Sequence, residues 1–87
     1  MSRLPTVPVD AVNVKREHLI PVDGMVAKVT SVDKTRPGRR AIYWQQVDAK
    51  PGQTPVTGVL PVREDGEVLC IRVSDWLDFL EREAVTR

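Results

Sequence analysis

The sequence has few of the residues that build covalent or metal-bound scaffolds. It contains one cysteine, Cys70, and one histidine, His18, among 87 residues. A lone cysteine excludes a disulfide within the chain, and these two side chains fall short of the roughly four ligands of a structural zinc site. We therefore expect no disulfide framework, no metal and no other cofactor.

Long apolar runs are missing as well. No segment approaches the roughly 20 apolar residues of a membrane span, and the N-terminus lacks the apolar block of a signal peptide. The charge is balanced, since 13 Lys+Arg stand against 12 Asp+Glu for a formal net charge of +1. These absences predict a small cytoplasmic protein of one domain, without membrane contact and without general affinity for nucleic acid.

Residue patterns typical of catalysis are also absent. His18 has no catalytic cysteine or motif serine beside it, and no glycine-rich phosphate loop occurs. Cys70 stands in an apolar strand-like run, where a free cysteine usually acts as a small core residue. We expect a protein that is not an enzyme and has no small-molecule substrate.

Regularly spaced turn dipeptides are the clearest feature that is present. Pro-Gly suits a type II turn and Asp-Gly a type I′ hairpin turn. The dipeptides are Asp23-Gly24, Pro37-Gly38, Pro51-Gly52 and Asp65-Gly66, with their glycines 14 residues apart. The segments between them are rich in β-branched and aromatic residues. They predict strands over residues 25–32, 41–47, 56–62 and 68–73.

The alternation of side chains along each strand, and the glycine and proline within the strands, refine this prediction. Leu69, Ile71 and Val73 share one face of the last strand, which predicts that they face the core. Gly58 indicates a bulge or sharp bend in the third run, and Pro61 suits an edge strand.

The two ends of the chain differ from the middle. Prolines at positions 5 and 8 predict an extended arm over residues 1–10, ahead of a single domain over 11–87. Residues 11–20 suggest a first strand, with a helical turn around 15–19 as the alternative. Residues 75–84 predict a helix capped by Ser74, with an apolar stripe bordered by Phe79. The stripe consists of Trp76, Leu77, Leu80 and Ala84.

This order of strands and turns resembles small SH3-like barrels and the KOW-type modules of translation and transcription. It is also similar to small uncharacterised proteins of actinobacteria and their phages. The resemblance covers about residues 12–73 and rests on Leu19-x-x-x-Asp23-Gly24-Met25-Val26-x-x-Val29-x-x-Val32, a basic turn, and Ala41-Ile42-Tyr43-Trp44. It implies an SH3-like barrel. Together with the helix predicted above, we expect a mainly β, SH3-like barrel of four to five antiparallel strands with one C-terminal helix. Such barrels bind RNA, DNA or protein and are seldom catalytic.

The near-zero net charge hides a polarised sequence. A basic turn over residues 34–40 carries Lys34, Arg36, Arg39 and Arg40, whereas residues 63–83 are mainly acidic. Four cations on one turn can contact phosphates, and an adjacent ring, Tyr43 or Trp44, can stack on a base. Alternation allows at most one of these rings in the core, and the alternative to stacking places the other ring beneath the C-terminal helix, beside Trp76. The plainer interpretation is a solvated hairpin tip.

The C-terminal helix supplies the other candidate site. A docked helix would complete the core. An undocked or shared helix would present Trp76, Leu77, Phe79 and Leu80 as an apolar surface that suits a protein partner or a homodimer. We expect a non-catalytic protein-interaction or regulatory accessory protein, in a phage or mobile-element setting suggested by the resemblance. The alternative is nucleic-acid binding through the basic turn and a neighbouring aromatic ring.

Overall fold

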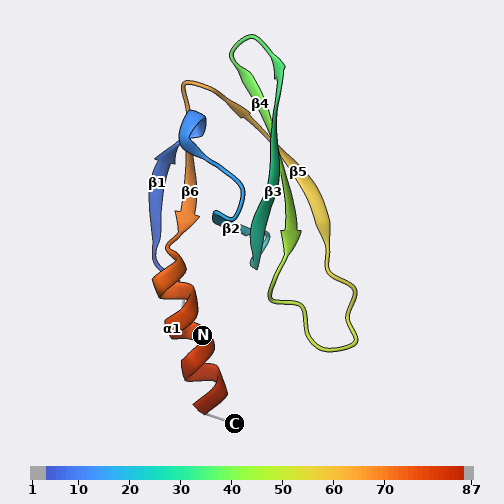
Figure 1. Ribbon diagram of the computed structural model, residues 1–87, viewed down its shortest axis with the longest axis vertical. Coiled ribbons are helices and arrows are strands. Elements are labelled where there is room, and N and C mark those ends of the chain that lie inside the picture. The colour runs from blue at the N-terminus through green and yellow to red at the C-terminus, as the bar shows by residue number, and fades with distance from the viewer. Residues whose placement is uncertain (1–3, 86–87) are drawn as a thin grey trace.

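The computed structural model describes residues 4–85, which form one β-sheet and two helical segments (Figure 1). The strands are β1 (Thr6–Asp10), β2 (Leu19–Val22), β3 (Met25–Arg36), β4 (Arg39–Gln46), β5 (Thr57–Arg63) and β6 (Glu67–Ile71). A 3₁₀ turn, η1 (Ala11–Asn13), follows β1, and the helix α1 (Val73–Val85) follows β6. The molecule measures 48 × 26 × 19 Å, with α1 and the β3–β4 turn at opposite ends of its long axis.

The sheet is antiparallel and open. Its strand order is β1-β6-β2-β3-β4-β5, so β2 to β5 pair in succession and β6 returns to lie between β2 and β1. No pairing joins the edge strands β1 and β5 within residues 4–85. Each edge strand contains a proline, Pro8 in β1 and the predicted edge proline Pro61 in β5. Proline lacks an N–H donor, which makes an edge a poorer template for further strands.

The prediction of a mainly β fold with one C-terminal helix is confirmed, but the strands number six and not four to five. Part of the predicted N-terminal arm accounts for the difference, because residues 6–10 pair along β6 from Thr6↔Ile71 to Asp10↔Glu67. The first strand expected over 11–20 begins only at Leu19. The chain before it turns through η1, which buries Ala11 and Val14 against the core.

Two of the turns test the predicted turn types directly. Asp23 and Gly24 both have positive φ, 48° and 78°, as a type I′ turn requires, so that prediction is confirmed. The type I′ prediction for Asp65-Gly66 is wrong, because neither residue has a positive φ. Gly66 N–H instead donates to the Arg63 carbonyl at 3.0 Å, which closes a turn of another type.

The larger core lies on the inner face of the curled sheet. Ile20, Val29 and Ile42 are its largest fully buried side chains, and Trp44 covers them from β4. Gly58 lies directly opposite Trp44 in an unbroken register between β4 and β5. Of the bulge or sharp bend predicted at Gly58, the bulge is therefore wrong. The irregularities of pairing between β3 and β4 lie between Val29 and Ser31 and between Lys34 and Arg36.

The last strand faces the core with the parity opposite to that predicted. Val68 and Cys70 are buried in the larger core, whereas Leu69 and Val73 are 55% and 53% exposed. Ile71 is buried, but on the other face, where the helix covers it. The prediction placed the larger side chains of this strand in the core. Val68 and Cys70 instead share the inner face with Val9 and Val7, the β1 residues opposite them.

Candidate functional site

The helix α1 docks onto the sheet through its first two turns. Trp76 stacks on Phe79, with ring centroids 5.6 Å apart and planes inclined by 14°. Trp76 forms a small second core with Leu19 and Ile71, and Phe79 packs against it. A helix of this length needs such a docking surface to persist in water. The helix extends away from the ends of β1 and β6 (Figure 1). Residues 80–84, which follow Phe79, are all exposed.

A second side of α1 carries apolar side chains into solvent. Val73, Leu77 and Leu80 are 53%, 56% and 43% exposed, and their spacing places them within a sector of about 60° on the helix. We call these three residues the helix stripe. Trp76 lies to one side of the stripe and docks, whereas Glu81 lies to the other side, in solvent. Three large apolar side chains aligned on one helix are typical of an interaction surface.

The rest of α1 is strongly acidic. Asp75, Asp78, Glu81 and Glu83 stand against Arg82 within Val73–Val85, a formal charge of −3. One of the acids is engaged at the start of the helix, where Arg72 Nε lies 3.4 Å from Asp75 Oδ2. The helix stripe is thus an apolar strip with an acidic border.

The predicted interaction residues divide between two roles. Trp76 and Phe79 belong to the docked side, while Leu77 and Leu80 are exposed as a surface requires. The single stripe predicted through Trp76, Leu77, Leu80 and Ala84 is therefore wrong in including Trp76. Val73 was missed because it was assigned to the preceding strand, although it stands one helical turn before Leu77. The helix also begins at Val73, so Ser74 lies inside its first turn and does not precede it as a cap.

The predicted basic turn divides between the two faces of the sheet. Arg36, Arg39 and Arg63 stand in one row across β3, β4 and β5, since Arg36 pairs with Arg39 and Arg39 with Arg63. Lys34 and Arg40 form the neighbouring pair and point to the inner face with Val62. Sequence reasoning missed Arg63, which lies 24 positions along the chain from Arg39 and joins the row only through strand pairing.

Some of the basic side chains in this region form ion pairs with carboxylates, and others do not. Lys34 Nζ lies 3.7 Å from Glu64 Oε1, and Arg63 holds Asp65 through Nε and a terminal nitrogen at 3.1 and 3.2 Å. Arg36 and Arg39 form no ion pair with any residue of the described range 4–85. Adjacent like charges in a sheet repel one another. The row therefore has unneutralised positive charge at Arg36 and Arg39.

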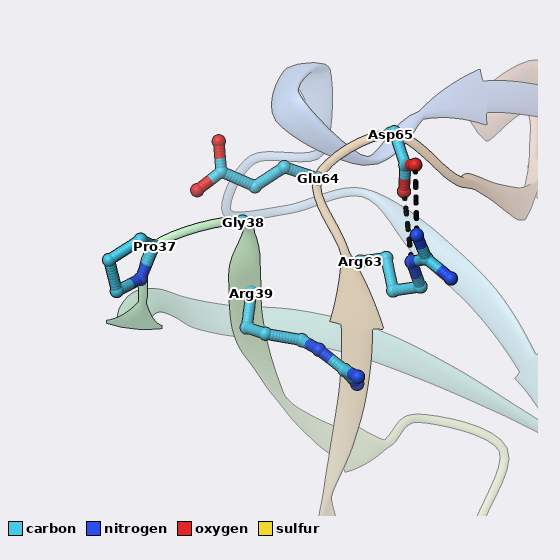
Figure 2. A pocket seen from close by; sticks show the side chains of 6 residues that line it. All are labelled: Pro37, Gly38, Arg39, Arg63, Glu64 and Asp65. Carbon is cyan, nitrogen blue, oxygen red and sulfur yellow. Dashed lines mark hydrogen bonds and ion pairs between the residues drawn. The ribbon is translucent and has the colours of Figure 1, made fainter.

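Figure 2 shows an open hollow beside this row, between the β3–β4 and β5–β6 turns. Its lining residues are Pro37, Gly38, Arg39, Arg63, Glu64 and Asp65. Glu64 N–H donates to the Gly38 carbonyl at 2.9 Å and ties the two turns together. Arg39 extends across β5, while Glu64 points away from Arg63 and Asp65 (Figure 2). The row of arginines is thus presented on one side of the molecule by two linked turns.

Tyr43 and Trp44 also separate, as alternation predicts. Trp44 is 8% exposed in the inner core and cannot stack on a ligand, whereas Tyr43 is 40% exposed. Tyr43 faces the same side as Arg39, four residues and about 13 Å away along β4. Opposite Tyr43 stands Val59, which is 51% exposed. We call this surface the outer face. It consists of Arg36, Arg39, Tyr43, Val59, Pro61 and Arg63, together with Asp33 and the buried Ala41.

The one histidine and the one cysteine of the sequence, His18 and Cys70, both lie within the structure as packing or hydrogen-bonding residues. His18 is half-buried, and its Nδ1 accepts the Lys15 N–H at 3.1 Å. Cys70 is buried in the larger core as predicted, and desolvation raises the pKa of its thiol. Among residues 4–85 no group of three or more His, Cys, Asp or Glu is placed to hold a metal ion. In the same range no helix has the length and apolar character needed to cross a bilayer.

A buried polar contact was also missed from the sequence. The Gln46 side chain is buried, donates from Nε2 to Asp48 Oδ1 at 3.0 Å and accepts the Val56 N–H at 3.1 Å. Asp48 Oδ2 accepts the Val26 N–H at 3.1 Å. These bonds fasten both ends of the long β4–β5 connection to the sheet. The only signal in the sequence is a glutamine at an inward-facing strand position.

Comparisons with protein-family models, with curated proteins and with solved structures find no match to this chain.

Proposed function

We propose that this chain is a non-catalytic protein-interaction module and that the helix stripe is its contact surface. The observation that carries the proposal is the exposure of Val73, Leu77 and Leu80 on a helix that extends beyond its own sheet. Exposed leucines contribute nothing to the core. Their alignment on one helix is what the groove of a protein partner recognises.

The chemistry of α1 specifies the partner. The stripe needs an apolar surface, and the formal charge of −3 on the helix needs a basic border around it. We infer an occupant that is a protein surface with an apolar centre and arginine or lysine at its rim. The contact is small and belongs to the weak class of interfaces, which suits a regulatory accessory protein.

The strand order supports the finer description of the fold as SH3-like. Four consecutive antiparallel strands, β2 to β5, curl into a meander, and β6 returns to pair with β2. β1 then lies outside this set as an additional edge strand. An SH3-like arrangement agrees with a binding function, because such folds present exposed sheet faces and turns to their ligands. The cytoplasmic location and the phage or mobile-element setting stay predictions from the sequence.

Nucleic-acid binding is the weaker alternative. Of its predicted residues, Arg36, Arg39 and Tyr43 share the outer face, whereas Lys34 and Arg40 point inward and Trp44 is buried. Asp33 also stands on the outer face, opposite Ala41, and Asp65 neutralises Arg63. Two carboxylates beside three arginines favour a mixed-charge protein surface over a phosphate backbone.

Photo-cross-linking from the helix tests the proposal. A photoreactive amino acid replaces Leu80, and in a matched control it replaces Thr54, an exposed residue of the β4–β5 connection. In cells of the source organism we expect a discrete protein adduct from position 80 that is absent from position 54. The adduct should disappear when Asp78→Arg and Glu81→Arg are added, since the basic border would then be repelled. Equal adducts at both positions, or none from position 80, would overturn the proposal.

A further inference from the structure

We propose that the helix stripe binds the outer face of a second copy of this chain, in a head-to-tail arrangement. This inference rests on the proposed function, because it names the partner of the same surface. The required occupant is an apolar surface with a basic rim, and the chain itself contains one.

The outer face has the required apolar centre. Tyr43 and Val59 stand directly opposite each other on β4 and β5 and are 40% and 51% exposed. The next outward pair along the two strands is Ala41 and the exposed Pro61. Ala41 is itself buried, at 7% exposed, so the accessible apolar centre consists of Tyr43, Val59 and Pro61. The helix α1 docks elsewhere, at Leu19 and Ile71 on β2 and β6.

The outer face also has the basic rim at the end of this apolar centre. Arg39 and Arg63 form the pair after Ala41 and Pro61, and Arg36 continues the row onto β3. Asp65 neutralises Arg63, so the unneutralised charge of the rim lies at Arg36 and Arg39. From the Tyr43 pair to the Arg39 pair the strands advance about 13 Å. The helix stripe runs about 10 Å from Val73 to Leu80. The two surfaces are therefore similar in length.

Charge decides between this arrangement and a symmetric one. Two helices packed through their stripes would bring two acidic borders together, each of formal charge −3. Two outer faces packed together would oppose their arginine rows. Only a contact between unlike surfaces places Asp78 and Glu81 of one copy beside Arg36 and Arg39 of the next.

A contact between unlike surfaces has a consequence for assembly. Where two copies share a single such contact, one keeps an unused outer face and the other an unused stripe, so the contact propagates into a ring or an open chain, whereas two reciprocal contacts about a two-fold axis close a dimer. A symmetric contact between like surfaces would also stop at two copies. The two kinds of assembly are distinguished by variants that block one surface at a time.

The test uses two blocked variants of the full chain. In the helix-blocked variant, Leu77→Ser and Leu80→Ser remove the stripe. In the face-blocked variant, Arg39→Glu and Val59→Ser remove the rim and part of the centre. A control variant carries Arg16→Glu and Val12→Ser, which make the same kinds of change at exposed positions outside both surfaces. Masses are measured by light scattering over a dilution series, and folding is checked by circular dichroism.

We expect the unmodified chain and the control to grow in mass with concentration, and each blocked variant alone to stay monomeric. An equimolar mixture of the two blocked variants should form a one-to-one dimer and grow no further, because one intact surface of each kind remains. Their association should be at least about tenfold weaker with Glu81→Arg in the face-blocked chain, whose helix is intact.

Three results would overturn the inference. A face-blocked variant that dimerises alone indicates a symmetric helix contact. A mixture that stays monomeric while the unmodified chain associates excludes the proposed pairing. An unmodified chain that is monomeric throughout excludes the contact, and if its outer face then binds a single-stranded oligonucleotide, that face is assigned to nucleic acid. The proposed function would survive the last result if the cross-link from position 80 captured a different protein.

Discussion

Trp44 and Gly58 lie directly opposite each other on β4 and β5, and the indole ring occupies the space that a side chain at position 58 would need. A Cβ at this position would stand 2.8 Å from Trp44 Cε2. The glycine thus leaves room for the largest ring of the inner core beside the edge strand that carries Val59.

Replacing this glycine tests the packing of the inner core. Gly58→Ala should lower the free energy of unfolding by about 1–3 kcal/mol, because the ring of Trp44 must move out of its packed position. Gly66→Ala is the matched control, since its Cβ would meet only the Arg63 carbonyl oxygen at 3.4 Å and Gly66 has no positive φ. Urea denaturation measures both. Equal effects at the two positions would contradict the packing described for Trp44.

The buried amide of Gln46 gives a second prediction. Gln46→Ala leaves the Val56 N–H and one oxygen of Asp48 without their partner, which should cost about 1–3 kcal/mol of unfolding free energy. The neighbouring exposed residue provides the control, and Gln45→Ala should change stability by less than about 0.5 kcal/mol. Similar losses from the two variants would show that the Gln46 contacts do not stabilise the β4–β5 connection.

The buried thiol of Cys70 should make the free energy of unfolding depend on pH in the alkaline range. Burial raises its pKa in the folded chain. Below the pKa of the unfolded chain the thiol is protonated in both states and has no effect on the pH dependence. Above about pH 8.5 the unfolded chain loses its proton first, so the free energy of unfolding falls as the pH rises toward the folded pKa. Cys70→Ala should lack this decline when unfolding is measured between neutral and alkaline pH. Parallel pH profiles for the two proteins would contradict the shift.

The two sides of α1 should respond differently to truncation. Trp76→Ala removes the centre of the second core and should lower the free energy of unfolding by about 3 kcal/mol. Leu77→Ala removes an exposed side chain and should change it by less than about 0.5 kcal/mol. Chemical denaturation at a concentration where the chain is monomeric gives both values. A large loss from Leu77→Ala would assign the stripe to the fold and not to binding.

Oligonucleotide binding separates the two candidate functions. We expect weak affinity for single-stranded oligonucleotides at physiological salt, because Asp33 and Asp65 accompany the arginine row. Three phosphate contacts would instead give a slope of about −2 in log affinity against log salt. Fluorescence anisotropy measures this slope. A slope of that size, lost with Arg39→Ala and Arg63→Ala but kept with Arg40→Ala, would establish the nucleic-acid alternative.

The sequence predicted the elements of this fold better than the faces they present. The turn dipeptides and β-branched runs placed the central strands, because Asp23-Gly24 and the prolines act through local backbone geometry. The parity of the last strand was missed, since Val68 and Cys70 are directed inward by their pairing with β1, a strand that two prolines concealed.

For the candidate site too, the sequence predicted the local elements but not which of their side chains are exposed. The basic turn and the apolar helix were both visible as local patterns. Their division between surface and core depends on contacts over long sequence separations, such as Arg39 with Arg63 and Trp76 with Leu19. No local pattern indicates that Trp76 docks while Leu77 stays exposed.

Hydrogen exchange along α1 tests the central claim most directly. In the monomer, the amides after Phe79 belong to helical turns that extend beyond the sheet, and they should exchange rapidly. With rising protein concentration we predict that they become protected together with residues 39–45 and 57–63. The variant with Leu77→Ser and Leu80→Ser should show no such protection. Exchange after Phe79 that is unchanged over the whole concentration range, or protection there without protection of β4 and β5, would contradict a head-to-tail contact through the helix stripe.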